Sequence, residues 1–378
     1  MGAICVTDKG PRYSSLDALR GLAAMVVLIH HCCLVSPALV GAVESRGQGP
    51  MASWLWWMTY TPVHLIWAGK EAVYVFFILS GFVLALPVVN NSGPKWPAYF
   101  SKRLVRIYLP VWASLVFALA LADAIPREAS SGLSPWLNMH DEATRWFSDA
   151  LLLSGPGSLN SPLWSLQWEM IFSLLLPLYI FVAIRINRAW LAGVFSLLVL
   201  IALASERLPA FAVYLPMFGI GVMLAARVQL LRVTGRRVGS WGWAGITAAS
   251  LVLLCAQWLF PQLPGFIALS AAGGALLIFA CIAWRPTEAL GKNRILQWLG
   301  TRSFSLYLVH EPIVVSIGFA SHITNPFLIA ALAIPLSLVA TEIFYRFIER
   351  PSLLLAGRVG RLMGRMGSRK QDLMMAQP

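Results

Sequence analysis

The sequence predicts an all-α, polytopic membrane protein with about ten membrane-spanning helices and both termini in the cytoplasm. Hydrophobic residues make up 58% of the 378 residues and charged residues only 12%, whereas a soluble domain carries about 25% charged residues. Ten apolar stretches approach the ~20 residues that a helix needs to cross a bilayer. Of the 29 Lys and Arg residues, 24 fall on the same side of these spans as the N-terminus. Because Lys and Arg accumulate in cytoplasmic loops, this bias predicts that both termini are cytoplasmic.

The predicted spans are joined by short loops, apart from two longer outer segments, 37–71 and 126–161. They cover residues 16–36, 72–90, 107–125, 162–184, 189–204, 210–226, 241–260, 265–284, 303–323 and 326–347. We expect residues 1–355 to form one membrane domain. Residues 356–378 are basic and interrupted by glycines, so we expect a cytoplasmic tail that is disordered or lies on the anionic inner leaflet.

The net charge of +13 does not indicate a nucleic-acid-binding protein. The basic residues lie in short loops between apolar runs, whereas a nucleic-acid reader carries a basic patch on a soluble fold. The five cysteines show neither a disulfide framework nor the spacing of a zinc site. We therefore expect the lipid bilayer as a partner, no nucleic acid and no metal, and the sequence leaves the oligomeric state open.

Ionisable residues inside the first span give the strongest indication of function. Arg20, His30 and His31 interrupt an apolar run, where charged groups are costly and usually face a protein interior. Arg20 and His31 are eleven residues apart, about 20° more than three helical turns, so they share one face at a separation of roughly 16 Å. His30 points about 80° away from that face. Because a neutral imidazole can take a proton from a hydroxyl, His31 is the predicted general base and His30 the alternative.

Basic residues on the cytoplasmic side form a candidate anion site. Arg20 lies about one turn inside the first span, and Asp17, three residues before it, can pair with it across one turn. Lys102, Arg103 and Arg106 follow the second span on the same side. Together they can bind an anionic ligand such as a nucleotide phosphate. The alternatives are that Arg20 anchors the helix at the interface and that the other three only set the topology.

Glu169 and the pair Ser80-Gly81 also lie inside predicted spans. Glu169 lies about 10 Å, and His31 about 7 Å, from the outer edges of their spans, so we expect this carboxylate to orient the imidazole. The alternative is a glutamate that faces water at a helix start. Ser80-Gly81 permits close approach of a helix or a ligand, and helix packing is the favoured interpretation.

A second histidine, His310, is predicted at the level of the arginines. It lies about 10 Å from the cytoplasmic end of span 303–323, and Glu311 follows it. Pro312 cannot donate a backbone hydrogen bond, so we expect a freed carbonyl and a bend in this helix.

Taken in order, these motifs resemble acyltransferase family 3, a family of integral membrane O-acyltransferases. The resemblance covers about residues 14–352, and the order of the motifs together with the topology makes it specific. The motifs are Leu16-Asp17-Ala18-Leu19-Arg20-Gly21, Phe76-Phe77-Ile78-Leu79-Ser80-Gly81-Phe82, Lys102-Arg103-Leu104-Val105-Arg106, Trp164-Ser165-Leu166-Gln167-Trp168-Glu169, Ser305-Leu306-Tyr307-Leu308-Val309-His310 and Ile348-Glu349-Arg350-Pro351.

The resemblance implies a multi-pass enzyme of the bacterial inner membrane. Its expected reaction is transfer of an acyl group, often acetyl, from acyl-coenzyme A to a hydroxyl of a carbohydrate or glycolipid. Acyl-coenzyme A is then a co-substrate, and no bound cofactor is expected. The site residues are His31 and Glu169 for catalysis, Arg20, Arg103 and Arg106 for binding acyl-coenzyme A, and Asp17, Ser80, Gly81, Trp164, Tyr307 and His310 in supporting roles.

Two alternatives stay open. Cys32 and Cys33 are potential nucleophiles, although adjacent helical positions diverge by about 100° and an apolar setting keeps a thiol inert. A secondary transporter or flippase for a glycan precursor also combines many spans with buried charge. Such a protein would move its cargo without acyl-coenzyme A and without changing it covalently.

Overall fold

The computed structural model describes residues 13–90, 95–140, 146–152, 157–261 and 265–375, and these ranges are helical without β-strands. The longer helices are α1 (Ser14–Leu34), α4 (Gly69–Asn90), α5 (Trp96–Ala124), α8 (Leu163–Arg185), α9 (Trp190–Arg207), α10 (Ala210–Ala226), α12 (Ser240–Leu254), α14 (Phe266–Ala283), α16 (Arg294–Ser321), α17 (Pro326–Phe344) and α18 (Arg350–Met375). The shorter ones are α2 (Pro37–Glu44), α3 (Ser53–Thr59), η1 (Pro62–Ile66), α6 (Pro135–Asn138), α7 (Trp146–Leu151), η2 (Asn187–Ala189), α11 (Val228–Gly235), α13 (Ala256–Leu259), α15 (Thr287–Lys292) and the π-helical turn η3 (Tyr345–Glu349).

The all-α membrane class is confirmed, whereas the predicted count of ten spans is not. Seven described helices are each long and apolar enough to cross a membrane, and α10 with α11, bent by 70° at their break, is an eighth candidate. A helix lies in each of the ten predicted ranges. However, the apolar parts of α9 (Trp190–Ser205) and of α12 fall short of the ~20 residues that a perpendicular span needs.

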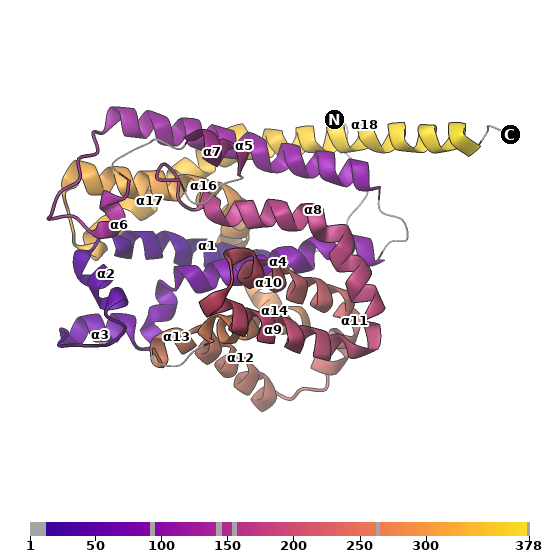
Figure 1. The fold of residues 1–378 in the computed structure, drawn as a ribbon, viewed down its shortest axis with the longest axis horizontal. Helices are drawn as coiled ribbons and strands as arrows, with labels where there is room; N and C mark the ends of the chain where they lie inside the picture. The colour runs from indigo at the N-terminus through magenta and orange to yellow at the C-terminus, as the bar shows by residue number, and fades with distance from the viewer. Residues whose placement is uncertain (1–12, 91–94, 141–145, 153–156, 262–264, 376–378) are drawn as a thin grey trace.

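Helices α1, α4 and α16 lie in the middle of the bundle, between α5 and α18 on one side and α9 to α14 on the other (Figure 1). Within the most apolar stretch of α16, 83% of the residues are buried, so this helix is surrounded by protein. Gly21 of α1 lies against the backbone of Gly300 of α16, and Gly300 lies against the backbone of Asp17. Because neither glycine carries a Cβ, α1 and α16 approach closely, as small residues allow in membranes.

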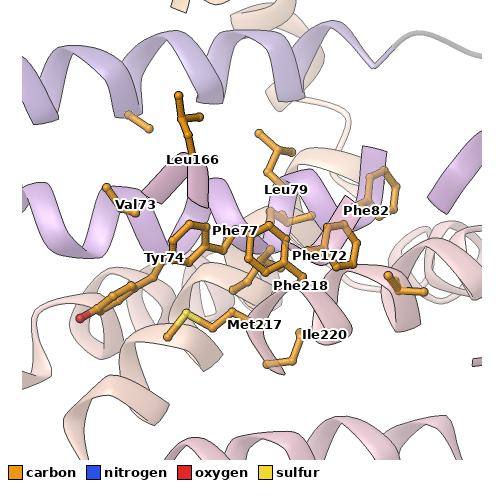
Figure 2. Packing of buried hydrophobic residues seen from close by; sticks show 14 of the residues in the cluster. Val73, Tyr74, Phe77, Leu79, Phe82, Leu166, Phe172, Met217, Phe218 and Ile220 are labelled. Carbon is orange, nitrogen blue, oxygen red and sulfur yellow. The ribbon is translucent and has the colours of Figure 1, made fainter. Parts of the chain in front are cut away.

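Aromatic side chains of α4, α8 and α10 form the centre of the largest hydrophobic cluster (Figure 2). Phe172 stacks on Phe218 with ring centroids 4.5 Å apart, and Phe77 lies 4.8 Å from Phe218. Gly81 of α4 lies against the backbone of Phe218, an approach that a larger residue would block. The packing interpretation is therefore confirmed for Gly81.

Much of the outer surface is apolar. Soluble monomers rarely expose large contiguous apolar patches, whereas helices satisfy their backbone groups internally and can face lipid. Exposed large apolar side chains on α8, α9 and α17 include Leu174, Leu178, Phe181, Leu191, Phe195, Leu203, Phe327, Leu336 and Val339.

Helix α18 occupies the region where the sequence predicts a tail that is disordered or lies on the inner leaflet. It continues α17 through η3, runs beside α5 and extends past the rest of the bundle (Figure 1). Gly360 of α18 lies against Ala98 and Lys102 of α5. This part of the tail is therefore not disordered, because a glycine that suggested disorder here permits helix packing. The alternative, that the basic segment lies on the inner leaflet, stays a prediction.

Candidate active site

A cavity between α1, α4, α5, α8 and α16 contains the predicted arginines. Its empty volume is about 850 Å³. Arg20 lines it from α1, and Arg103 and Arg106 line it from α5. Within the described part of the chain, neither Arg20 nor Arg106 forms an ion pair, and the expected pair of Arg20 with Asp17 is not formed. Two guanidinium groups therefore remain for an anionic ligand.

Arg103 and Glu169 form an ion pair in the wall of this cavity. Arg103 Nη2 donates to Glu169 Oε1, and Arg103 Nε donates to Ser173 Oγ at 3.0 Å. Ser80 Oγ donates to the same carboxylate oxygen at 3.1 Å. These charge-assisted hydrogen bonds connect α4, α5 and α8. The bonds to Glu169 and Ser173 hold Arg103 in place. Removing Glu169 would leave the charge of Arg103 buried and uncompensated, which is costly.

A second polar cluster lies further along α1 and α16. His310 Nε2 is 3.0 Å from His31 Nδ1. His31 Nε2 is 3.8 Å from Glu311 Oε1, and His140 Nε2 is 3.3 Å from the same oxygen. The ring of Trp136 covers His31 at a centroid distance of 5.5 Å. We call His31, His140, His310 and Glu311 the histidine–glutamate cluster.

Backbone carbonyls fix the tautomers of the three histidines. The Nδ1 atom of each ring lies 2.9–3.0 Å from the carbonyl oxygen four residues earlier, on Val27, Trp136 and Leu306. A carbonyl can only accept, so Nδ1 carries the proton and Nε2 is the accepting nitrogen of the neutral ring. The one proton of His31 Nδ1 is therefore shared between two acceptors, the Val27 carbonyl and His310 Nε2. The lone pair of His31 Nε2 is left on the side of Glu311.

Glu311 is held by several donors. Ser161 donates its backbone N–H to Glu311 Oε2 at 2.5 Å and its hydroxyl to Oε1. His140 Nε2 lies 3.3 Å from the same Oε1 atom. Arg127 lies nearby and donates to the His140 carbonyl at 3.3 Å. Burial lowers the pKa of Arg127, and the Glu311 carboxylate opposes this change.

His31 is the accessible member of the histidine–glutamate cluster. Its side chain is 11% exposed, compared with 1% for His140 and 0% for Glu311, and His310 is fully buried. His31 is therefore the ring of this cluster that an entering hydroxyl can reach. When His31 Nε2 takes a proton, the carboxylate 3.8 Å away stabilises the positive charge. The arrangement can thus act as a general base supported by a carboxylate.

Tyr307 and Ser165 lie between the cavity and the histidine–glutamate cluster. Both line the cavity, and their hydroxyl oxygens are 2.7 Å apart. The Tyr307 hydroxyl also donates to the Pro162 carbonyl at 3.1 Å, and its ring lies 5.9 Å from that of His310. His31 is not among the lining residues of the cavity. Tyr307 therefore closes the cavity on the side of the histidines.

The structure reverses the predicted positions of Glu169 and His310. The sequence places Glu169 beside His31, but it pairs with Arg103, and the sequence places His310 with the arginines, but it contacts His31. Helix α16 begins at Arg294, sixteen residues before His310, so His310 lies about 24 Å along its helix. His31 lies about 26 Å along α1. The two histidines are therefore at one level.

The position of Glu169 follows from where α8 begins. Asn160 and Ser161 precede this helix, and they already contact Leu308 and Glu311 inside the bundle. Glu169 is two helical turns further on, which brings it to the arginines. The Leu308 carbonyl that accepts from Asn160 at 3.0 Å is the one that Pro312 cannot bond. The predicted freed carbonyl is thus confirmed.

The remaining predicted residues lie outside both polar groups. His30 Nδ1 is 2.9 Å from the Trp67 carbonyl and the His30 ring stacks on Trp67, so His31 alone of the pair contacts His310. Trp164 packs against Phe77 and Tyr214, and Asp17 lies at the contact of α1 with α16. The thiols of Cys32 and Cys33 are free and buried.

Sequence reasoning missed two members of the histidine–glutamate cluster, Glu311 and His140. Glu311 carried the same signal as His31, an ionisable residue inside an apolar run. His140 lies in an outer segment where a histidine is unremarkable, so no local signal could have identified it. Only the packing of α6 against α16 brings it to Glu311.

Comparison with known proteins supports an acyltransferase. A family model described as an acyltransferase domain matches residues 13–346. The acyltransferase MdmB of Streptomyces mycarofaciens is 23% identical over 389 aligned residues, covering 92% of this chain and 94% of the relative. YrhL of Bacillus subtilis (strain 168), provisionally named a peptidoglycan O-acetyltransferase, is 28% identical over 332 residues, covering 75% of this chain and 51% of the relative.

A third relative is the O-acetyltransferase PaAT-1 of Phomopsis amygdali, which is 23% identical over 390 residues, covering 81% of this chain and 73% of the relative. No solved structure matches the chain significantly. The family match spans most of the chain and includes the arginines that line the cavity, Glu169 and all four residues of the histidine–glutamate cluster. The protein therefore belongs to acyltransferase family 3, the membrane acyltransferases that its motifs resemble.

Proposed function

We propose that the protein transfers an acyl group, in the simplest case acetyl, from acyl-coenzyme A to a hydroxyl of a cell-surface or extracytoplasmic carbohydrate or glycolipid. We place the reaction in the inner membrane of a bacterium. Two relatives named as O-acetyltransferases support an acetylated product. The one provisionally named for peptidoglycan supports a cell-surface glycan as acceptor. One structural observation carries the proposal. An arginine-lined cavity and an accessible imidazole beside a carboxylate lie along the same face of α1.

Acyl-coenzyme A fits the cavity by charge. Its nucleotide end carries phosphates, and Arg20 and Arg106 line the cavity without ion-pair partners in the described chain. Guanidinium groups bind phosphate through paired hydrogen bonds. The pantetheine arm would then extend toward His31, roughly 16 Å from Arg20 along α1. In this proposal the arm passes Tyr307, whose side chain moves to admit the thioester.

The chemical step needs one base and no covalent enzyme intermediate. His31 Nε2 takes the proton of the acceptor hydroxyl while its oxygen attacks the thioester carbonyl. The carbon–oxygen bond forms, the carbon–sulfur bond breaks, and the coenzyme A sulfur leaves with the electron pair of that bond. The proton on His31 then passes to the departing thiolate, which restores the neutral imidazole.

The carboxylates have different roles in this proposal. Glu311 acts as a positioning residue, because it lies 3.8 Å from His31 Nε2 and stabilises the imidazolium. Glu169 acts on the donor side, because its ion pair and the Ser173 hydroxyl fix Arg103 in the cavity wall. His310 accepts from His31 Nδ1 and so maintains the tautomer that leaves Nε2 free.

The proposal is tested by comparing cell-surface glycans from a deletion strain with those from a strain that expresses the protein, after feeding isotope-labelled acetate. We expect one class of glycan to lose a labelled acetyl mass in the deletion strain and to regain it on complementation. Loss of a whole glycan, with no acetylated product, would instead indicate a transporter or flippase. Unchanged acylation of every glycan would contradict the proposal.

A further inference from the structure

A second cavity lies on the other side of α1 and α4 from the arginines. Helices α1, α4, α12, α14 and α15 enclose it, and its empty volume is about 1060 Å³. Its lining is almost entirely apolar and includes Leu19, Val26 and Val75. None of the residues of the histidine–glutamate cluster lines it. The proposed acyl transfer therefore leaves this cavity unexplained.

A buried carboxyl group with an unused oxygen faces this apolar space. Glu71 lines the cavity and is 2% exposed. Its Oε1 accepts from the Trp258 indole N–H at 2.9 Å. Among the described residues, Glu71 Oε2 has no hydrogen-bond partner, and the buried hydroxyl of Thr247, which also lines the cavity, has none. Unsatisfied buried polar groups are costly, so a ligand that donates a hydrogen bond to Glu71 would be favoured.

Trp258 is held in position by aromatic stacking. Its ring lies 3.9 Å from that of His64, and the His64 ring lies 4.3 Å from that of Trp67. The ring of His30 stacks in turn on Trp67, with ring centroids 5.9 Å apart. Because these rings pack against one another, the indole N–H stays directed at one oxygen of Glu71. The second oxygen is therefore presented to the cavity.

The cavity has the length and the opening that a lipid chain requires. On α1 its lining extends from Ser15 to Val26, about 16 Å along the helix axis, close to half of the ~30 Å hydrocarbon thickness of a bilayer. Leu22, Leu251 and Leu290 belong to the lining and are substantially exposed. The cavity is therefore open toward the lipid-facing surface, and Glu71 lies at one end, within the first turn of α4.

We propose that this cavity binds one hydrocarbon chain of a bilayer phospholipid whose head group donates a hydrogen bond to Glu71. An ammonium head such as ethanolamine matches both the charge and the acceptor character of a carboxylate. A choline head has the same charge but no N–H group, so it cannot make this bond. The site is independent of acyl-coenzyme A and of the catalytic base.

The test uses the purified full-length protein in phosphatidylcholine nanodiscs. A small amount of phosphatidylethanolamine with a photoreactive diazirine in its acyl chain is added, or the matched phosphatidylcholine probe. After irradiation, peptide mass spectrometry locates and quantifies the labels. We expect labelling on α1, α12 and α14 around the cavity, with about tenfold more label from the ethanolamine probe, the size that a hydrogen bond to a charged group supports.

Two variants separate the contributions of the head group and the chain. Glu71→Leu should reduce the ethanolamine-to-choline ratio from about ten to about one. Ala280→Leu adds volume to a buried position of the lining and should reduce labelling by both probes. Ala192→Leu, at an exposed position of α9, is the matched control and should leave both probes unchanged.

Equal labelling by the two probes in the wild-type protein would overturn the head-group assignment. Labelling that Ala280→Leu leaves unchanged would overturn the cavity as the chain site. If Glu71→Leu does not fold, the wild-type ratio still tests the head-group assignment, and Ala280→Leu still tests the cavity as the chain site. None of these measurements requires acyl-coenzyme A, so an absence of acyl transfer and an absence of lipid binding are distinguishable.

Discussion

His30 and His31 are neighbours in the chain, but their rings have different environments. The ring of His31 contacts His310 and lies near Glu311, whereas that of His30 stacks on Trp67. We expect His31→Ala to lower acyl transfer by about 10²- to 10⁴-fold, the usual contribution of a general base. His30→Ala should retain most activity. The measurement is incorporation of labelled acetyl into membrane glycans, normalised to the amount of inserted protein.

The reverse pattern, with His30→Ala inactive and His31→Ala active, would move the base by one residue. Full activity of the double variant would remove a histidine base from the mechanism. Circular dichroism of both purified variants checks that the helical fold is intact, since His31 also bonds the Val27 carbonyl.

Glu311 is expected to affect catalysis through His31. The substitution Glu311→Gln keeps the shape of the side chain but removes the charge that stabilises the imidazolium. We expect kcat to fall by on the order of 10²-fold and KM for acyl-coenzyme A to stay unchanged, because the arginine-lined cavity is separate. Steady-state kinetics with acetyl-coenzyme A checks this. A rise in KM at constant kcat would instead place Glu311 in donor binding.

Arg20 and Arg106 are expected to act on donor binding. Each lines the cavity without an ion pair in the described chain. Replacing either by Met should raise KM for acyl-coenzyme A about 10- to 100-fold, the size of a hydrogen bond to a charged group, with a smaller effect on kcat. A donor analogue without the nucleotide should show no such difference between wild type and variants. Equal loss with both donors would contradict phosphate binding.

The close contact between α4 and α10 depends on two glycines. Gly81 of α4 lies against the backbone of Phe218, and Gly221 of α10 lies against the backbone of Ile78. A Cβ at either position would force the backbones apart. We expect Gly81→Ala and Gly221→Ala each to destabilise the protein by about 1–3 kcal/mol, as overpacking does. Thermal unfolding in detergent, followed by tryptophan fluorescence, measures the change.

Gly41 supplies the matched control for these two variants. It lies in helix α2, and a Cβ there would meet no atom within 4 Å. Gly41→Ala should leave stability unchanged or raise it by about 0.4–1 kcal/mol, because alanine restricts the unfolded chain. If all three variants unfold at the same temperature, the close contact of α4 with α10 is not what stabilises the bundle.

Helix boundaries explain why the positions of site residues were harder to predict than their identities. The start of α16 at Arg294 and the entry of Asn160 and Ser161 into the bundle before α8 shift His310 and Glu169 by two or more turns. Amphipathic and polar residues at helix ends give no apolar signal. A depth counted from the apolar run alone therefore misplaces the side chain.

The orientation of the whole bundle is a prediction from the distribution of Lys and Arg. We expect a fluorescent protein fused after residue 378 to fluoresce, because the C-terminus should be cytoplasmic. Alkaline phosphatase inserted after Ser131, in the segment between α5 and α6, should be active because this segment should lie outside. If alkaline phosphatase fused at the C-terminus were active instead, the orientation would be the reverse of the predicted one. The arginine-lined cavity would then lie on the outer side, away from cytoplasmic acyl-coenzyme A.

Composition and motif order were enough to predict the membrane class, the family, and the approach of Arg20, Arg103 and Arg106 to one another. Apolar length and the choice of charged residues are local properties, and charge at membrane depth must face protein. The pairing of Glu169 with Arg103 and the assembly of His31 with His310, Glu311 and His140 needed the folded bundle. These contacts join segments more than sixty residues apart, and their partners depend on how far each helix extends and where neighbouring helices touch, which no local pattern encodes.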